Sequence, residues 1–588
     1  MTTAALFQQG LAHHQAGRLA EADACYRQLL AREPAHADSL HLLGVIAHQL
    51  GRNEAAVEAI GRAIAAQPRV ADYHSNLGNV LRALGRLDPA VASYRAALAL
   101  KPDYPVAQYN LGNALRDLGR AKEAEAGYRQ AVRLKPDFAE AHHNLGTLLR
   151  EDGRLAEAER HYRAALRGQP GNPAWHCALG DTLRAQDRPE AAVACYRTAL
   201  GLKPDYPEAL NNLGNALRAL DRPAEAEAAY RQALGLKPGF VDAQANLAIL
   251  LMLDNRLDEA VEACRATLRL DPDHAVAHAN LGVLLLRAGR LAEGWPEYEW
   301  RWRVGPEIGL QDRGFSQPRW TGEALGGRVL LIHAEQGYGD TIQFCRYLSL
   351  AAAYGRVVLE VPRPLLRLLS DLPGIERIVA TGDPLPEFDL HCPLLSLPGV
   401  FGTTLDTIPA TVPYLAADPS GAMVWRDRLA ALPGLRVGLV WAGNPARHVA
   451  MAQAVDRRRS IGLAQLAPFA AIHGVTFVSL QKGEAAGAVP LSGMVVHDWT
   501  DELTDFADTA ALVQALDLVI SVDTAVAHLA GALGKPVWLL NRFDTCWRWL
   551  ADRDDSPWYP TLRQFRQPRP GDWDSVLDEV RAALATLA

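Results

Sequence analysis

The chain has 588 residues, of which 49% are hydrophobic and 22% charged, a composition typical of a globular protein rather than a disordered one. Its formal net charge is −7 and it has no basic stripe, so we do not expect a nucleic-acid partner. The N-terminus lacks the pattern of a secretory signal, no apolar run is long enough for a membrane span, and the seven cysteines show no CxxC spacing. We expect a cytoplasmic protein of several domains with reduced thiols.

Proline recurs every 34 residues in the first half of the chain, at Pro34, Pro68, Pro102, Pro136, Pro170, Pro204, Pro238 and Pro272. This period is typical of helix–turn–helix units that stack into a superhelix. In one unit, the first helix is predicted over about 72–84 and the second over about 89–100, because apolar residues recur at helical spacing and Gly85 fits the turn between them. The pattern resembles the tetratricopeptide repeat, and we expect an all-α superhelix of about nine repeats over residues 1–304.

Asparagine occupies one position of the first helix in most of these repeats, at Asn76, Asn110, Asn144, Asn212, Asn246 and Asn280. A carboxamide both donates and accepts hydrogen bonds, so a row of them can hold an extended peptide backbone. The row resembles the asparagine ladder in the groove of protein O-GlcNAc transferase, which implies a groove for an acceptor protein. The other interpretation is that these side chains bridge neighbouring helices.

Residues 305–327 break the repeat period and are rich in glycine and polar residues, as expected of a connector. Four tryptophans lie in or near it: Trp295, Trp300, Trp302 and Trp320. We expect them to pack the last repeat onto the next domain, and an aromatic platform for a sugar is the alternative.

From residue 328 the pattern alternates between strands and helices. Strands are predicted at 328–334, 356–361, 375–380, 435–443, 475–481, 517–522 and 535–540, and helices at 340–354, 362–372, 463–472, 508–516 and 525–533. Two successive sets of such units predict two doubly wound parallel α/β lobes, at 328–420 and at 421–588 with a C-terminal helix. Ligands of these sheets bind beyond the carboxyl ends of the strands, so we expect a crevice between the lobes.

The first strand is followed by Gly337, Gly339 and Asp340. The two glycines permit a tight turn and close approach of the backbone to a ligand. Asp340 falls at the start of the next helix, where it is either a functional carboxylate or a helix cap.

Two further segments follow strands of the second set. Gly443 and Asn444 form a glycine loop, and an arginine cluster that ends at Arg459 is predicted before the next helix; together they suit an anionic leaving group, or form only a solvated basic turn. Asp523 and Thr524 end a later strand at a helix N-terminus, with His528 one turn into that helix.

The segments GYGD (337–340) and SVDTAVAHLAGALGKPVW (521–538) resemble the bacterial heptosyltransferase-like glycosyltransferases of family 9, which have the two-lobed GT-B fold. The resemblance implies inverting transfer of a sugar from a nucleotide-sugar co-substrate, with no metal and no other cofactor. It implies that Asp340 is the general base. It places the donor at Gly337, Gly339, Gly443, Asn444, Arg459, Gln481, Lys482, Asp523, Thr524 and His528.

The sequence departs from that family at Ala525, where glycine is usual, and in its tail from Asn541 to Gln567. The tail is similar to that of bacterial proteins that join tetratricopeptide repeats to such a domain, some of which modify flagellin. We therefore expect a protein O-glycosyltransferase whose repeats hold the acceptor, with flagellin as a candidate. The alternatives are a glycosyltransferase that acts on lipopolysaccharide or another glycan, with the repeats docking a partner, and a non-catalytic adaptor.

Overall fold

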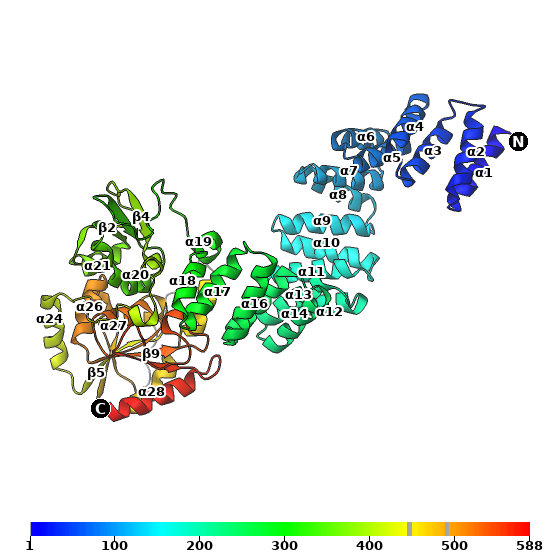
Figure 1. Ribbon diagram of the computed structural model, residues 1–588. Coiled ribbons are helices and arrows are strands. Elements are labelled where there is room, and N and C mark those ends of the chain that lie inside the picture. The colour runs from blue at the N-terminus through cyan, green and yellow to red at the C-terminus, as the bar shows by residue number, and fades with distance from the viewer. Residues whose placement is uncertain (1, 444–449, 488–492, 588) are drawn as a thin grey trace. The chain divides into compact units, whose positions relative to one another are not determined.

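The computed structural model describes residues 2–443, 450–487 and 493–587. The chain divides into two compact units, residues 1–238 (unit 1) and 239–588 (unit 2). Unit 1 is entirely helical among its described residues, and unit 2 joins further helices to two parallel sheets (Figure 1). The predicted fold class, an all-α repeat region followed by parallel α/β lobes, is confirmed.

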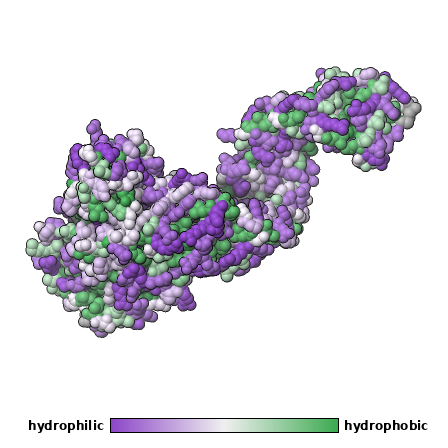
Figure 2. Space-filling model, in the orientation of Figure 1, coloured by the Kyte–Doolittle hydropathy of each residue, from purple (hydrophilic) through white to green (hydrophobic). Residues whose placement is uncertain are grey.

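The helices of unit 1 are arranged in antiparallel pairs. They are α1 (Thr3–Gln15), α2 (Leu19–Leu30), α3 (Ala37–Gln49), α4 (Asn53–Ala66), α5 (Ala71–Ala83), α6 (Leu87–Leu100), α7 (Pro105–Asp117), α8 (Ala121–Leu134), α9 (Ala139–Glu151), α10 (Leu155–Gly168), α11 (Pro173–Ala185), α12 (Pro189–Leu202), α13 (Pro207–Ala219) and α14 (Pro223–Leu236). On the face seen in Figure 2, hydrophilic residues are interspersed with smaller apolar areas, as expected of amphipathic helices.

The turn inside each pair needs a residue with positive φ. Glycine supplies it in most repeats, for example at Gly85 (φ 71°), whereas Asp187 (φ 58°) and Asp221 (φ 55°) take its place in two others. A second glycine lets the paired helices touch: a Cβ on Gly78 would lie 2.6 Å from the Tyr94 ring, and one on Gly112 would lie 2.7 Å from the Tyr128 ring. The recurring Gly and Tyr are therefore two halves of one packing contact.

Unit 2 begins with five more helices that continue the repeat pattern. They are α15 (Val241–Leu253), α16 (Leu257–Leu270), α17 (Ala275–Arg287), α18 (Leu291–Tyr298) and the short α19 (Arg301–Val304). Trp295 is buried, donates from Nε1 to the carbonyl of Thr403 at 2.8 Å and meets the Trp547 ring edge-on. Trp320 is also buried, so both pack the last repeat and the connector against the α/β lobes as predicted.

The first sheet contains β1 (Val329–His333), β2 (Arg356–Val361), β3 (Ile375–Ala380) and β4 (Leu390–Pro393) in the order β3-β2-β1-β4. The second contains β5 (Leu435–Val440), β6 (Val475–Ser479), β7 (Val496–Asp498), β8 (Leu518–Val522), β9 (Val537–Asn541) and β10 (Leu562–Arg566) in the order β10-β9-β8-β5-β6-β7. The strand pairs within each sheet are parallel. The strands β4, β7 and β10 were not predicted; β4 and β7 are only four and three residues long, whereas β10 is five residues long, like β1, and the sequence pattern did not reveal it.

The helices around the sheets include α20 (Tyr338–Phe344), α21 (Leu348–Ala352), α22 (Leu366–Leu369), α23 (Leu397–Val400), α24 (Pro419–Ala430), α25 (Ala450–Arg459), α26 (Phe506–Ala515), α27 (Ala525–Ala532) and α28 (Trp573–Leu587). Three predicted helices were wrong in detail. The helix predicted over 362–372 begins as a 3-10 turn at Arg363–Leu365 and is α-helical only over Leu366–Leu369. The helix predicted over 340–354 is broken between α20 and α21 by a 3-10 turn, and 463–471 is 3-10 rather than α-helical. Pro468 lies inside the 463–471 segment and cannot donate an α-helical hydrogen bond.

The arginine cluster was also misplaced relative to its helix. Arg457, Arg458 and Arg459 form the last turn of α25 instead of preceding a helix. Cations are favoured at a helix C-terminus by the helix dipole, which accounts for the position.

Candidate functional site

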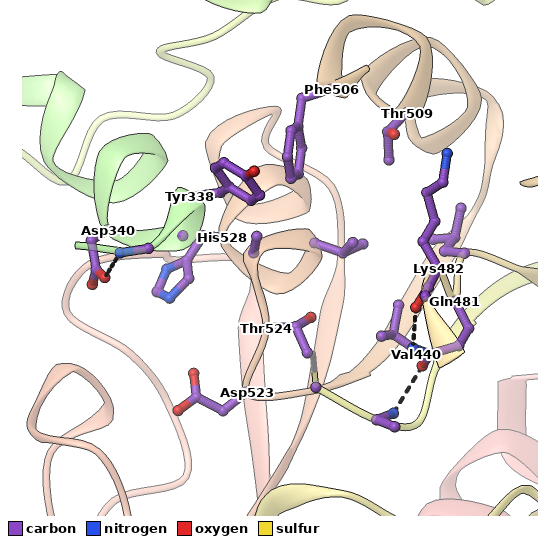
Figure 3. A pocket seen from close by; sticks show the side chains of 18 of the residues that line it. Tyr338, Asp340, Val440, Gln481, Lys482, Phe506, Thr509, Asp523, Thr524 and His528 are labelled. Atoms are coloured by element: carbon purple, nitrogen blue, oxygen red, sulfur yellow. Dashed lines mark hydrogen bonds between the residues drawn. The ribbon is translucent and has the colours of Figure 1, made fainter. Parts of the chain in front are cut away.

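A pocket of about 910 Å³ opens at the carboxyl ends of the strands in both sheets of unit 2 (Figure 3). Residues in the segments that follow β1, β2, β5, β6, β8 and β9 line it, as the topology predicts. The structure brings together in this pocket Gly337, Gly339, Asp340, Gly443, Arg459, Gln481, Lys482, Asp523, Thr524 and His528. Asn444 lies outside the described residues.

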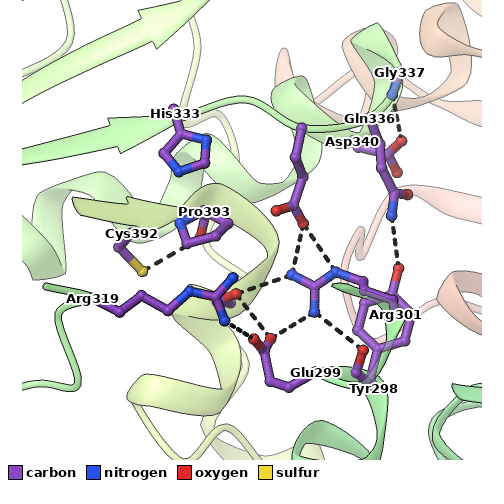
Figure 4. Close-up of polar contacts among 12 residues, drawn as sticks. Tyr298, Glu299, Arg301, Arg319, His333, Gln336, Gly337, Asp340, Cys392 and Pro393 are labelled. Carbon is purple, nitrogen blue, oxygen red and sulfur yellow. Dashed lines mark hydrogen bonds and ion pairs between the residues drawn. The ribbon is translucent and has the colours of Figure 1, made fainter. Parts of the chain in front are cut away.

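The Asp340 carboxylate has two partners. Its Oδ2 accepts a hydrogen bond from the backbone N–H of Gly337 at 2.9 Å, which caps the first turn of α20 (Figure 4). Its Oδ1 forms an ion pair with Arg548, whose side chain is 10% exposed. Sequence analysis missed Arg548, because no motif connects it to a residue about two hundred positions earlier.

Arg548 is itself held in place by several groups. Its Nη1 donates to the sulfur of Cys546 at 3.1 Å and its guanidinium lies 4.5 Å from the Trp547 ring centroid. Burial opposes its charge, but the nearby Asp340 carboxylate raises the pKa of Arg548 overall. The pair therefore joins the two lobes by a contact between two charged, mostly buried side chains.

Gly339 explains why the first motif contains a second glycine. A Cβ at this position would lie 2.8 Å from Cδ2 of His528 and 3.3 Å from Cα of Ala525. Helix α20 of the first lobe thus packs directly on α27 of the second. The GYGD segment and the Asp523–His528 segment, which the sequence predicted separately, are in contact.

His528 is buried at the floor of the pocket. It is 3% exposed, stacks on Trp549 with ring centroids 4.7 Å apart, and its Nδ1 lies 3.0 Å from the Tyr559 hydroxyl. Burial lowers the pKa of His528 to about 3, so the ring is neutral at physiological pH. A neutral imidazole here can hydrogen-bond a ligand but carries no charge to offer it.

Gln481 organises the loop after β5. Its Oε1 accepts from the backbone N–H groups of Trp441 at 3.1 Å and Ala442 at 2.9 Å, while Gly443 donates its N–H to Ser460 Oγ at 3.1 Å. A Cβ on Gly443 would lie 2.1 Å from Asp456 Oδ1, so a larger residue here would displace the Asp456 and Arg459 side chains. The backbone N–H groups of Trp441, Ala442 and Gly443 are therefore engaged within the protein.

Arg459 connects α25 to the end of β8. Its Nε and Nη2 donate to Asp456 Oδ1 at 3.0 and 2.9 Å, and its Nη1 donates to the carbonyl of Asp523 at 2.9 Å. Burial acts to raise the pKa of Asp523, but the positive charges of Arg459 and Arg542 hold it below its usual range. Asp523 is thus an ionised carboxylate beside Thr524, whose Oγ1 lies 2.9 Å from Ser521 Oγ.

Aromatic side chains from both lobes line another part of the pocket. The rings of Tyr338 and Phe506 meet edge-on with centroids 5.3 Å apart (Figure 3), and Tyr338 is 42% exposed. Nearby, the ammonium of Lys482 donates to the carbonyl of Leu503. Sequence analysis missed the aromatic pair, because Phe506 begins α26, a helix far along the chain from Tyr338 and without a recognisable motif.

The last repeat is bonded to the segment that carries the first motif (Figure 4). Arg301 is 1% exposed and donates from Nη2 to Glu335 Oε1 at 2.7 Å and from Nη1 to Glu299 Oε1 at 2.6 Å. Gln336 donates from Nε2 to the Tyr298 hydroxyl at 3.1 Å. The α18–α19 segment is therefore part of the wall that supports the pocket.

The repeat asparagines are half-buried, and the amides of several make contacts inside the superhelix. Nδ2 of Asn110 donates to Asn79 Oδ1 at 2.9 Å, and Nδ2 of Asn144 donates to Asn113 Oδ1 at 2.9 Å. Asn212 donates to Asp181 at 3.0 Å, and Asn76 lies 2.8 Å from Nε2 of His41. These contacts fit the helix-bridging interpretation; the acceptor groove stays a prediction for these residues and for Asn246 and Asn280.

Within the described residues, no group of three or more His, Cys, Asp or Glu side chains is arranged to hold a metal ion. In the same residues, no helix combines the length and hydropathy of a membrane span.

Comparison with known proteins identifies relatives of both halves. A family model described as Tetratricopeptide repeat matches residues 7–63, 109–173, 177–239, 214–275 and 245–298. A second model, described as TPR repeat, matches residues 78–119. Residues 503–540 match Glycosyltransferase family 9 (heptosyltransferase), a range that contains Asp523, Thr524 and His528. The two resemblances seen in the sequence are thereby confirmed.

The chain is 30% identical over 326 residues to Protein FlbA of Caulobacter vibrioides. The alignment covers 50% of this chain and 53% of that protein, so the chain spans about half the length of this curated relative. Among solved structures, YrrB, a TPR protein with an unusual peptide-binding site, is 23% identical with a TM-score of 0.29 and covers 31% of this chain and 95% of its own. PilF of Pseudomonas aeruginosa is 23% identical with a TM-score of 0.33, covering 36% and 97%.

Proposed function

We propose that the chain is a glycosyltransferase that transfers a sugar from a nucleotide-sugar to a Ser or Thr hydroxyl of a protein held by its repeats. One observation carries the proposal. Asp340 of the first lobe and the Asp523–His528 segment of the second line one pocket, at the strand ends where parallel sheets bind ligands. The family 9 match over residues 503–540 supports the same chemistry.

In this proposal Asp340 is the general base. The acceptor hydroxyl gives its proton to the carboxylate as its oxygen bonds to the anomeric carbon, and the bond from that carbon to the phosphate oxygen breaks with its electron pair. Attack from the face opposite the phosphate inverts the anomeric centre and needs no metal. The hydroxyl would share Asp340 Oδ1 with Arg548, since a carboxylate oxygen has two lone pairs.

The second lobe would bind the donor. Asp523, Thr524 and His528 lie at the start of α27, and Gln481 and Lys482 follow β6. Arg459, which the resemblance assigns to the leaving phosphate, is near the same end of the pocket. Developing negative charge on the phosphate is stabilised by cationic groups that are already oriented before the reaction.

The repeats support a protein as the acceptor. Tetratricopeptide repeats form extended surfaces that bind other chains, and the last of them is bonded to the pocket wall through Tyr298 and Arg301. We propose flagellin as the first acceptor to test, on the basis of the similar tail of bacterial proteins that modify it. A glycan acceptor, with the repeats docking a partner enzyme, is the competing outcome.

The test compares intact masses of abundant surface proteins, flagellin first, from cells with the wild-type gene and with Asp340→Ala. Loss of sugar-sized mass increments in the variant supports a protein acceptor and gives the mass of the transferred sugar. Unchanged masses contradict the protein acceptor. A thermal-shift panel of nucleotide-sugars tests donor binding separately, because a non-catalytic adaptor should show no stabilisation by any of them.

A further inference from the structure

Arg542 is a buried arginine of the pocket that no motif predicted. It directly follows β9, lines the pocket and is 8% exposed. Its Nε and Nη1 have no hydrogen-bond partner in the described part of the chain. Asp544 Oδ1 lies 3.3 Å from Nε, but this carboxylate is shared with Arg458, whose Nη2 lies 3.1 Å from Asp544 Oδ2.

The other cations of the pocket are engaged with protein groups. Arg459 donates to Asp456 and to the Asp523 carbonyl, and Lys482 donates to the Leu503 carbonyl. Arg548 pairs with Asp340, and only its Nε is without a hydrogen-bond partner among the described residues. The backbone N–H groups of Ala442 and Gly443 donate to Gln481 and Ser460. Among the described basic side chains that line the pocket, Arg542 thus has the most hydrogen-bonding capacity to offer an anion.

Burying guanidinium N–H groups without acceptors is costly, so a position of this kind suits a ligand that supplies them. The fork of a guanidinium matches two oxygens of a phosphate. Asp544 already balances part of the charge of Arg542, but it leaves N–H groups of the guanidinium without acceptors, and phosphate oxygens would supply them. The chemistry at Arg542 is therefore that of a phosphate site.

We propose that Arg542 is the residue that binds the phosphate of the nucleotide-sugar donor, in place of Arg459. This rests on the proposed function. When the bond from the anomeric carbon to the phosphate oxygen breaks, the electron pair stays on that oxygen, and Arg542 stabilises the resulting charge. Arg459 is a positioning residue that holds the Asp523 carbonyl and the end of β8.

The test measures binding to the full-length chain by titration calorimetry, or by NMR for weak ligands. The probes are UDP, GDP, ADP and CMP, each with its parent nucleoside. The variants are Arg542→Gln, Arg542→Lys and Arg459→Gln, and the control is Arg569→Gln, whose side chain is 81% exposed. Thermal unfolding without ligand reports whether each variant folds.

We expect Arg542→Gln to weaken binding of the preferred nucleotide roughly 10- to 100-fold and to leave its nucleoside unaffected, because only the nucleotide has the phosphate. Arg569→Gln should change neither. Nucleotide affinity of Arg542→Gln within twofold of wild type, or an equal loss for nucleotide and nucleoside, overturns the inference. If Arg542→Gln does not fold, Arg542→Lys is decisive, since it keeps the charge but not the fork: a nucleotide-selective loss supports the inference and wild-type affinity overturns it.

Failure of the proposed function gives a different result. If wild-type protein binds none of the nucleotides or nucleotide-sugars, the donor site itself is wrong and the inference falls with it. If wild type binds a nucleotide and only Arg459→Gln loses it, the donor site stands and the assignment to Arg542 is wrong.

Discussion

Asp340 is bound on both oxygens, by the Gly337 N–H at 2.9 Å and by the guanidinium of Arg548 from the opposite lobe. The carboxylate is thus a helix cap, half of an interlobe ion pair and the proposed base. These roles make different predictions, so they can be separated.

If Asp340 is the base, Asp340→Asn should lower turnover on the order of 10²- to 10⁴-fold with little change in donor affinity. The amide keeps the shape of the side chain but cannot take the proton. Single-turnover rates with a labelled donor are the measurement, and Asp406→Asn, an exposed acid of the same lobe, is the control. Full turnover by Asp340→Asn would refute the assignment.

The ion pair itself should be visible as coupling in stability. Asp340→Asn and Arg548→Met each leave one partner of a mostly buried pair uncompensated, so each alone should destabilise unit 2 by about 3–5 kcal/mol. The double variant should cost clearly less than the sum of the two. Urea unfolding of the four proteins in the cycle measures this, and simple additivity would show that the two charges do not interact.

Gly339→Ala should separate α20 from α27. Within a helix, alanine is more favourable than glycine by about 1 kcal/mol. However, the Cβ that this substitution adds would lie 2.8 Å from the His528 ring, and overpacking of this kind destabilises a protein by about 1–3 kcal/mol. We expect a lower melting temperature and weaker donor binding. Gly337→Ala is the matched stability control, since its nearest neighbour would be Asp340 Oδ2 at 3.4 Å. Equal stability of the two variants would contradict the contact.

The repeat asparagines can be tested in acceptor binding. The double variant Asn110→Ala and Asn144→Ala removes two amides from the superhelix, and we expect KM for the acceptor protein to rise roughly 5- to 30-fold with donor affinity unchanged. Both side chains also bridge helices, so the melting temperature must be measured alongside. Glu151→Ala, at an exposed residue of α9, is the control. Lower stability with an unchanged KM would assign the asparagines to helix bridging alone.

Acid should destabilise unit 2 through His333. Burial, with help from His391 and nearby arginines, lowers the pKa of His333 to about 3, whereas the unfolded residue titrates near 6.5. The folded pKa is depressed, so the stabilisation is present above pH 6.5 and is lost as pH falls toward 3. The slope is up to about 1.4 kcal/mol per pH unit for this one group.

The measurement is urea unfolding followed by tryptophan fluorescence between pH 7 and 5. Trp175 is the one tryptophan of the sequence before residue 239, so fluorescence mainly reports unit 2. His333→Gln should flatten the dependence on pH, and exposed His473→Gln should not. Parallel curves for wild type and His333→Gln would rule out this contribution.

The sequence by itself determined the repeats and most of the alternating strands and helices of the α/β lobes. The 34-residue spacing and the Gly–Tyr pairing reflect contacts between helices close together in the chain, and the βα alternation reflects local periodicity. It also placed Asp340, Asp523 and His528 at strand ends, because parallel sheets bring those ends to one edge.

Only the tertiary structure decided which groups meet there. Arg548 reaches Asp340 and Arg542 reaches the pocket from a tail whose sequence has no periodicity to read. Likewise, Arg459 and Gln481 are committed to protein partners, which their residue types could not reveal. Local sequence specifies helices and strands. The partners of a charged side chain depend instead on packing between segments that are far apart in the chain. Those partners decide which charged groups can still bind a ligand.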